Sequence, residues 1–323
     1  MGGYTLVTRI RHIPSKILLP LLSRISRHGL RPHAGRALFF TPALVLLVLL
    51  VIYPVLQTIF LGFYLELPGG QRQFTGLDNY RAVLTDPATI NVGNLPWPPP
   101  LGTLIHNALW IVIHLPISLF AGLWLALLLQ ETKGASVVKS CIFLGMVTPM
   151  IVGGVILRFL LEAGVGVVPS FFGVIGVRSL AVNWMVHREL LLLGLILGSV
   201  WLWTGFSLIV YSAGLTTIPK DYFEAARVDG TPPGRMFFRI TFPLLKPLTL
   251  VIVVMTILWE LKIFDIVVAA TNFGGGVGAD TLALQVYRFF FYDSNAGKAA
   301  VVASLLTLLT LISTSLILRR MAK

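Results

Sequence analysis

Charged residues are scarce in this chain, and the few that it has are unevenly spread. Only 12% of the 323 residues are Asp, Glu, Lys or Arg, whereas 56% are hydrophobic. Soluble domains typically carry about 25% charged residues, so the composition argues against a soluble globular protein. The charges collect in short islands between long apolar runs, which is typical of a protein that crosses a membrane several times as helices.

The residues of several common functional sites are also missing. The single cysteine, Cys141, excludes a disulfide framework or a cysteine-based metal site within the chain. There is no G-x-x-x-x-G-K-[ST] phosphate loop, no H-E-x-x-H zinc motif and no G-x-S-x-G nucleophile motif. His106 and His114 lie about 80° apart around one helix, and we interpret them as local hydrogen-bonding groups. We therefore expect no catalytic residue, no metal site and no cofactor in this chain.

Acidic residues are half as frequent as basic ones, which gives a net charge of +12. Such a charge can indicate nucleic-acid binding, but here the basic residues flank apolar runs, so we interpret them as determinants of membrane topology. The first 36 residues hold seven Lys or Arg and no acid, and we expect no cleavable signal peptide. Residues 1–37 form a basic arm, either an interfacial helix on the inner leaflet or a disordered anchor.

Six apolar stretches are long enough to cross the hydrocarbon core, which takes about 20 residues in a helix. They lie near residues 38–63, 103–129, 138–161, 189–215, 247–270 and 297–318. Pro54, Pro116 and Pro149 lie inside the first three stretches and predict kinks there. The predicted fold class is an all-α membrane protein, with a six-helix transmembrane domain at 38–323 after the arm.

The distribution of Lys and Arg predicts the orientation. With the N-terminus inside, the inner segments hold 17 of these residues and the outer segments hold six. Because basic residues are enriched in cytoplasmic segments, we expect both termini to be cytoplasmic. The same count places a polar segment at about 216–246 in the cytoplasm.

That polar segment, which includes DYFEAARVDGTPPGRMFFRITFP at 221–243, is punctuated for two helices. Gly230 suits a left-handed C-cap after the first helix. Thr231 is the expected N-cap of a second helix, with Pro232 in its first turn. We expect the second helix to end before Pro243. Since a plain connector needs only about 2–8 residues, a helix–turn–helix that binds another protein is favoured over a solvated connector.

Polar residues inside the fifth stretch need partners, because burying them in lipid is costly. Thr256 and Glu260 are four apart and share a helix face. Lys262 and Asp265 are three apart and are expected to form a structural ion pair. Glu260 has no partner on its own face, so it is protonated, paired with another span or subunit, or facing a wet cavity.

Several segments resemble one transporter family. EAARVDG at 224–230 and RITFPLLKP at 239–247 resemble the EAA loop of ABC importer permeases. FTGLDNYRAVLTDP at 74–87, the segment 203–226, and FDIVVAATNFGGG at 264–276 resemble the carbohydrate-uptake branch. The resemblance covers roughly residues 38 to 320. One departure is FGGGVG where the family has a Gly-Gly-Pro turn, so the resemblance implies nothing about that turn's shape.

The resemblance implies a type I ABC importer permease architecture and a set of partners. Two ATPase subunits would bind ATP and Mg, a second permease would complete a hetero- or homodimer, and an extracytoplasmic sugar-binding protein would deliver the substrate. Membrane lipids are implied and nucleic acid is not. The implied location is a bacterial or archaeal plasma (inner) membrane, as a multi-pass protein. The implied function is import of a sugar or oligosaccharide, such as an α-glucoside, without enzymatic activity in this chain.

The resemblance also implies two groups of functional residues. The coupling helix that docks on the ATPase would use Glu224, Ala225, Ala226, Asp229 and Gly230. A substrate site midway across the membrane would use Ser199, Leu202, Trp203, Thr256 and Glu260. There Trp203 would stack on a sugar ring while Glu260 and Thr256 accept hydroxyl hydrogen bonds, although Ser199 and Leu202 could equally serve only to pack helices.

Three alternatives remain open from the residues. The first is an ABC permease for a non-sugar solute such as glycerol phosphate. The second is a membrane-embedded glycosyltransferase, which would need an acidic cluster that the sequence does not show. The third is an ion-coupled secondary transporter, which would favour internal repeats with broken helices and leaves the EAA-like loop unexplained.

Overall fold

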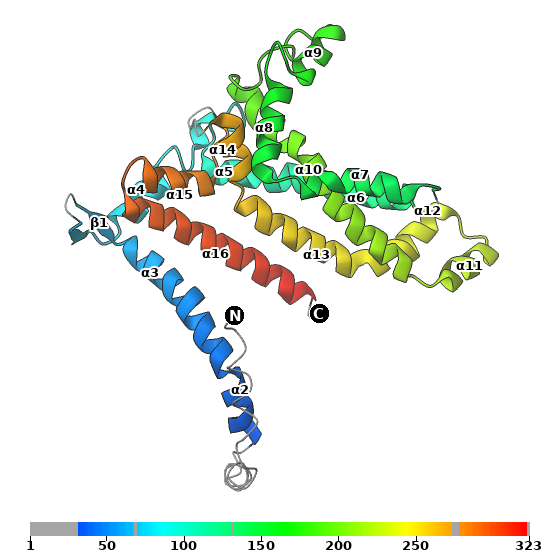
Figure 1. Ribbon diagram of the computed structural model, residues 1–323, viewed down its shortest axis with the longest axis horizontal. Helices are drawn as coiled ribbons and strands as arrows, with labels where there is room; N and C mark the ends of the chain where they lie inside the picture. Colours follow the sequence, from blue (N-terminus) through cyan, green and yellow to red (C-terminus); the bar gives the residue numbers. More distant parts are fainter. Residues whose placement is uncertain (1–31, 68–69, 131, 273–277, 322–323) are drawn as a thin grey trace, which may run out of the picture. The chain divides into compact units, whose positions relative to one another are not determined.

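The computed structural model describes residues 32–67, 70–130, 132–272 and 278–321 (Figure 1). The chain divides into two compact units, Met1–Gln57 and Thr58–Lys323, and the second carries the candidate functional sites. Most of the basic arm and the glycine turn at 273–277 lie outside the described residues.

Helices make up most of the described chain. In chain order they are α2 (Pro32–Leu47), η2 (Val48–Ile52), α3 (Tyr53–Leu61), α4 (Asp78–Thr85), η3 (Val92–Asn94), α5 (Thr103–Leu109), η4 (Trp110–His114), α6 (Leu115–Leu128), α7 (Ala135–Val147), α8 (Met150–Leu161), α9 (Val167–Val174), α10 (Arg188–Thr217), α11 (Lys220–Val228), α12 (Pro233–Met236), η5 (Phe237–Thr241), α13 (Phe242–Leu261), α14 (Asp265–Thr271), α15 (Leu282–Phe291) and α16 (Ala296–Met321). Strands β1 (Tyr64–Glu66) and β2 (Arg72–Phe74) pair antiparallel, with Leu65 opposite Gln73.

Five continuous helical stretches in the described residues are long and apolar enough to span a membrane. They are Phe40–Leu61, Thr103–Leu128, Arg188–Thr217, Pro233–Leu261 and Ala296–Arg319. A sixth span results if α7 and α8 are counted together, although they are bent by 98°. The predicted all-α fold with six spans is therefore confirmed, whereas the prediction of one continuous helix at 138–161 is wrong. The helix breaks because Thr148 and Pro149 are extended, as residues at an X-Pro step prefer.

Three prolines are each preceded by a π-helical turn. η2, η4 and η5 end two residues before Pro54, Pro116 and Pro243 respectively. A proline lacks an N–H, and its ring collides with the carbonyl four residues earlier. The wider π turn relieves that collision, and the N–H of Phe242 bonds instead to the carbonyl of Phe237, five residues back. The second helix of the polar segment therefore does not end before Pro243, as expected from the sequence, but runs on into α13.

The fifth span is displaced from its predicted range of 247–270. It occupies Pro233–Leu261, and α14 is a separate helix after a break at residues 262–264. Two side chains bind backbone carbonyl oxygens at the break. Asn107 Nδ2 donates to the backbone carbonyl oxygen of Glu260 at 2.8 Å, and Thr281 Oγ1 donates to that of Ile263 at 2.7 Å. Because the helix stops here, Lys262 and Asp265 do not form the expected ion pair.

The long helix α10 holds the second unit together. It packs against α6, α7, α8 and α13 (Figure 1). Small residues permit this close approach: a methyl group added at Gly122 on α6 would lie 2.3 Å from the Ser207 Cβ on α10. Helices in membranes commonly associate through such small residues. The apolar core around α10 includes Leu195, Ile196 and Leu202.

Candidate functional site

A pocket of about 320 Å³ lies beside the break between α13 and α14. It is formed by residues from α8, α10, α13 and the start of α14. The lining residues are Met150, Trp203, Met255, Leu258, Trp259, Lys262, Ile263, Phe264, Asp265 and Ile266. The pocket thus combines aromatic and aliphatic surface with one cation and one carboxylate, and both charged residues are exposed.

Two tryptophans form a stacked wall of this pocket. The rings of Trp203 on α10 and Trp259 on α13 have centroids 4.7 Å apart and planes 14° apart. Trp203 Nε1 donates to Thr256 Oγ1 at 2.7 Å, and Thr256 Oγ1 in turn donates to the Ile252 oxygen at 2.8 Å. The indole N–H of Trp203 is thereby satisfied inside the protein, so its ring presents mainly apolar surface to the pocket.

Glu260 lies behind the wall and not in the lining. Its side chain is 0% exposed, and its Oε1 lies 2.7 Å from Nδ1 of His114, which is also 0% exposed. Of the three possibilities for Glu260, pairing with another span is therefore the one observed. His106 is likewise a local hydrogen-bonding residue, since its Nε2 accepts from the Leu101 N–H at 2.9 Å.

The five substrate-site residues expected from the sequence occupy two kinds of position. Trp203 lines the pocket, with 8% of its surface exposed. Ser199, Leu202, Thr256 and Glu260 are fully buried. Ser199 Oγ donates to the Ile196 oxygen at 2.8 Å, and Leu202 belongs to the apolar core. Trp203 is therefore the one expected substrate-site residue that lines the pocket, and the other four are buried and absent from its lining.

Sequence reasoning missed Lys262, Asp265 and Trp259 as lining residues. The signal was present, because Lys262 and Asp265 are charged and lie close to Trp259 in a mostly apolar stretch. The expected intrahelical ion pair requires a continuous helix, and the helix breaks between the two charged residues. Asn107, which holds the break open, was not identified at all; an asparagine inside an apolar span is the signal that could have identified it.

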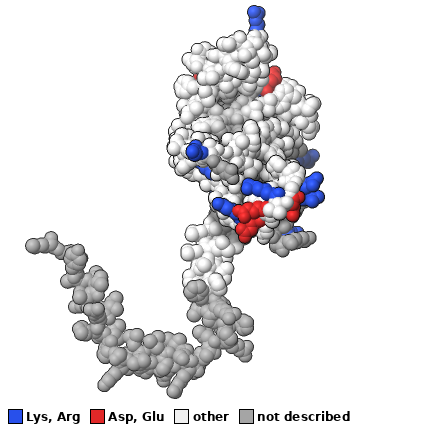
Figure 2. Space-filling view, turned by 90° about the vertical axis from the view of Figure 1, so that its right-hand side faces the viewer, with Lys and Arg blue, Asp and Glu red and all other residues white. Residues whose placement is uncertain are grey.

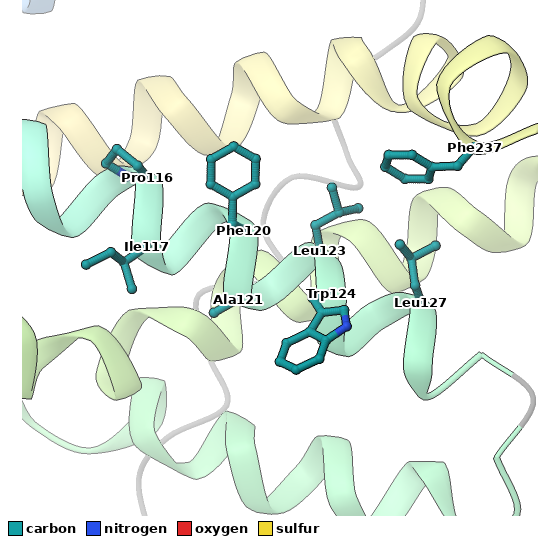
Figure 3. Close-up of a pocket in the computed structure, with 8 residues that line it drawn as sticks. All are labelled: Pro116, Ile117, Phe120, Ala121, Leu123, Trp124, Leu127 and Phe237. Atoms are coloured by element: carbon teal, nitrogen blue, oxygen red, sulfur yellow. The ribbon is translucent and has the colours of Figure 1, made fainter. Parts of the chain in front are cut away.

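A second cavity of about 670 Å³ lies against α6 (Figure 3). Its lining residues are Pro116, Ile117, Phe120, Ala121, Leu123, Trp124, Leu127 and Phe237. The side chains drawn in Figure 3 are hydrocarbon or aromatic apart from the indole nitrogen of Trp124. Since recognition of a hydroxylated solute needs several placed polar groups, this groove is not suited to bind one.

The polar segment after α10 forms the predicted helix, turn and helix. α11 ends in a Schellman motif: the Thr231 N–H bonds to the Ala226 oxygen at 2.9 Å, and the Gly230 N–H bonds to the Arg227 oxygen at 3.0 Å. Gly230 has φ +67°, which confirms the left-handed C-cap. The second helix begins at Pro233 with Pro232 as its N-cap, one position later than the expected N-cap at Thr231 and first helical residue at Pro232.

α11 presents a mixed surface at its end of the unit. Figure 2 faces this end, where Lys and Arg side chains surround a cluster of acidic ones. Glu224, Ala225 and Asp229 are exposed, whereas Ala226 is buried. Ala226 is therefore not exposed for the ATPase contact that the resemblance implies, whereas Val228 is 88% exposed. A helix with exposed apolar residues among charges suits docking to another protein.

No cluster of three or more His, Cys, Asp or Glu in the described part of the chain could hold a metal ion. Cys141 is a free, exposed cysteine. The pocket and α11 are therefore the two candidate functional features in the described part of the chain.

Comparison with known proteins identifies both sequence and fold relatives. The family model described as binding-protein-dependent transport system inner membrane component matches residues 118–322. A probable ABC transporter permease protein of Pyrococcus horikoshii is 52% identical over 285 residues, which cover 87% of this chain and 96% of that protein. The osmoprotective compounds uptake permease protein of Synechocystis is 33% identical, with 84% and 93% covered. The alpha-glucoside transport system permease protein of Rhizobium meliloti is 29% identical, with 84% and 78% covered.

Among solved structures, the fold is similar to a chain of a bacterial ABC transporter involved in the import of the acidic polysaccharide alginate. The TM-score is 0.68 at 20% identity, and the match covers 94% of this chain and 100% of that one. The arrangement of helices in the second unit is thus one that a transporter subunit adopts.

Proposed function

The chain belongs to the family of binding-protein-dependent transport system inner membrane components and is a permease subunit of an ABC importer; from this premise we propose that it moves a sugar or oligosaccharide into the cell. Relatives at 26 to 29% identity carry names that specify lactose, alpha-glucoside and arabinooligosaccharide transport. An α-glucoside is one candidate within this class.

The pocket beside the α13–α14 break carries the proposal. Sugars present apolar ring faces and a rim of hydroxyls, so their sites combine flat aromatic surface with directional hydrogen-bonding groups. The Trp203–Trp259 wall supplies the first, and Lys262 and Asp265 supply the second. In this proposal Trp203 contacts the sugar ring, as inferred from the sequence. The exposed Lys262 and Asp265, rather than Glu260 and Thr256, bind the sugar hydroxyls.

The remaining parts of the importer follow from the same proposal. α11 docks on a cytoplasmic ATPase, with Glu224, Ala225, Asp229 and Gly230 at the contact. Two ATPase subunits bind ATP and Mg and drive alternating access, so this chain performs no bond chemistry and binds no cofactor. A second permease, identical or similar, completes the translocation path, and an extracytoplasmic binding protein delivers the sugar. The location is a bacterial or archaeal plasma membrane.

Uptake by the assembled complex tests the substrate class. The tagged chain is purified with its partners, reconstituted in vesicles and supplied with the loaded binding protein and ATP. We expect uptake of a radiolabelled α-glucoside to be reduced by unlabelled oligosaccharides and unaffected by glycerol phosphate. Competition by glycerol phosphate alone would instead assign an anionic solute, which the exposed Lys262 could also hold, and would overturn the sugar proposal.

Labelling of single cysteines tests the orientation. The parent protein carries Cys141→Ser, and reporters are placed at Leu77 and Val228, whose side chains are 66% and 88% exposed. Asn79 is unsuitable because it is buried and donates to the Gly62 oxygen at 3.0 Å. Since basic residues favour the cytoplasmic side, an impermeant maleimide should label Leu77→Cys from outside intact cells and label Val228→Cys only after lysis. The reverse pattern would place α11 away from any cytoplasmic ATPase.

A further inference from the structure

A buried polar pair lies directly behind the tryptophan wall. His114 is the last residue of the π turn η4, and its Nδ1 lies 2.7 Å from Glu260 Oε1 on α13. Neither side chain is exposed. π turns inside helices often occur at functional positions, and this one comprises Trp110–His114 of the second span.

Among the described residues, His114 is the side chain that hydrogen-bonds to the carboxyl group of Glu260. Its other oxygen, Oε2, has no hydrogen-bond partner in the part of the chain that the structure describes. An isolated carboxyl buried inside a membrane protein is costly, and leaving it unpaired costs more than the pair is worth. Removing the imidazole therefore forces Glu260 to move toward another polar environment.

Ring contacts transmit the position of this pair to the pocket. The His114 ring lies 5.3 Å from the Trp259 ring, and Trp110, also on η4, meets Trp259 edge-on at 6.3 Å and 82°. Trp259 stacks in turn on Trp203, and both tryptophans line the pocket. Glu260 is the residue next to Trp259, so a shift of its backbone turns the indole as well.

We propose that His114 and Glu260 form a positioning pair that sets the orientation of the Trp203–Trp259 wall and thereby the affinity for substrate. The inference rests on the proposed function, because it concerns the same pocket. It differs from direct recognition by Glu260, since the carboxyl is fully buried and is absent from the lining. The pair acts only through the tryptophans.

Matched variants separate positioning from direct contact. His114→Leu removes the hydrogen-bond partner of Glu260. His114→Gln and Glu260→Gln instead introduce an amide that can hydrogen-bond to the remaining partner. A direct ionic ligand would be lost in Glu260→Gln, but a positioning pair would be retained. The double variant His114→Leu/Glu260→Leu removes both polar groups and leaves no unpaired carboxyl.

The variants are assayed in the complete reconstituted importer. For His114→Leu we expect the KM for uptake to rise about tenfold, the size expected when a buried polar group loses its hydrogen-bond partner, with a smaller change in maximal rate because α11 is intact. His114→Gln and Glu260→Gln should stay close to wild type. The double variant should be less impaired than the sum of the two single leucine variants.

A second measurement does not depend on transport. Near-ultraviolet circular dichroism of the purified complex reports the stacked indoles, and the Trp203→Phe variant identifies their contribution. We expect His114→Leu to lose that contribution and His114→Gln to keep it. An unchanged spectrum and KM in His114→Leu, or a Glu260→Gln variant as impaired as Glu260→Leu, would overturn the proposal. If the importer carries a non-sugar solute, the spectral result still decides the positioning role.

Discussion

Replacing Gly230 by valine is expected to reduce both transport and substrate-stimulated ATP hydrolysis while leaving the subunit inserted in the membrane. Gly230 has φ +67° and forms the Schellman turn that aims α11. A side chain there costs about 1–2 kcal/mol in the left-handed region, and a β-branched one costs more. Substrate-stimulated ATPase activity and uptake should therefore fall by about tenfold, since 1.4 kcal/mol corresponds to a factor of ten.

The surroundings of Gly230 distinguish a conformational effect of the substitution from a steric one. Apart from its neighbours in the chain, no described residue lies within 4 Å of a Cβ placed there, so the effect is conformational rather than steric crowding. Gly230→Asn is the conservative control, because asparagine tolerates the left-handed conformation. Gly234→Ala is the matched control in the same loop, since its Cβ would also meet open space without a positive φ. Wild-type coupling in Gly230→Val would mean that the loop is only a connector.

The second large effect is expected in the pocket. Asp265→Asn and Lys262→Met each remove a charge from the lining, and a hydrogen bond to a charged group contributes about 1.5–3 kcal/mol. The KM for uptake should rise by roughly tenfold to a hundredfold, while Trp203→Ala should weaken uptake through loss of the ring surface. Transport into vesicles is measured beside ATPase activity stimulated by the loaded binding protein, which should survive in part because α11 is unchanged.

Glu189→Gln provides the matched control for Asp265→Asn. Both carboxylates lie in the first turn of a helix, so both interact with a helix dipole, but Glu189 does not line the pocket. Substrate binding to the isolated delivery protein should be the same in every case. If Asp265→Asn, Lys262→Met and Trp203→Ala all transport like wild type in correctly assembled complexes, the substrate site belongs to the other permease.

Features that depend on neighbours in the chain could be predicted from the sequence. Apolar runs of sufficient length located four of the spans closely, because a helix in lipid satisfies its backbone within the segment itself. Gly230 located the end of α11, since a left-handed C-cap has few alternatives to glycine. The position of Glu260 in an apolar span predicted that it needs a partner, and its separation of four from Thr256 predicted a shared buried face.

The tertiary structure decided where helices stop and which polar groups meet. The break after Leu261 exists because Asn107, 153 positions away from Glu260, captures carbonyls that a continuous helix would have used. That capture separated Lys262 from Asp265 and placed both at the pocket. His114 and Glu260 are 146 positions apart in the sequence, and they become partners only because the spans that carry them lie side by side. The local sequence shows that a polar residue in an apolar span needs a partner, because its burial is costly. Only the packing of distant segments determines which residue that partner is.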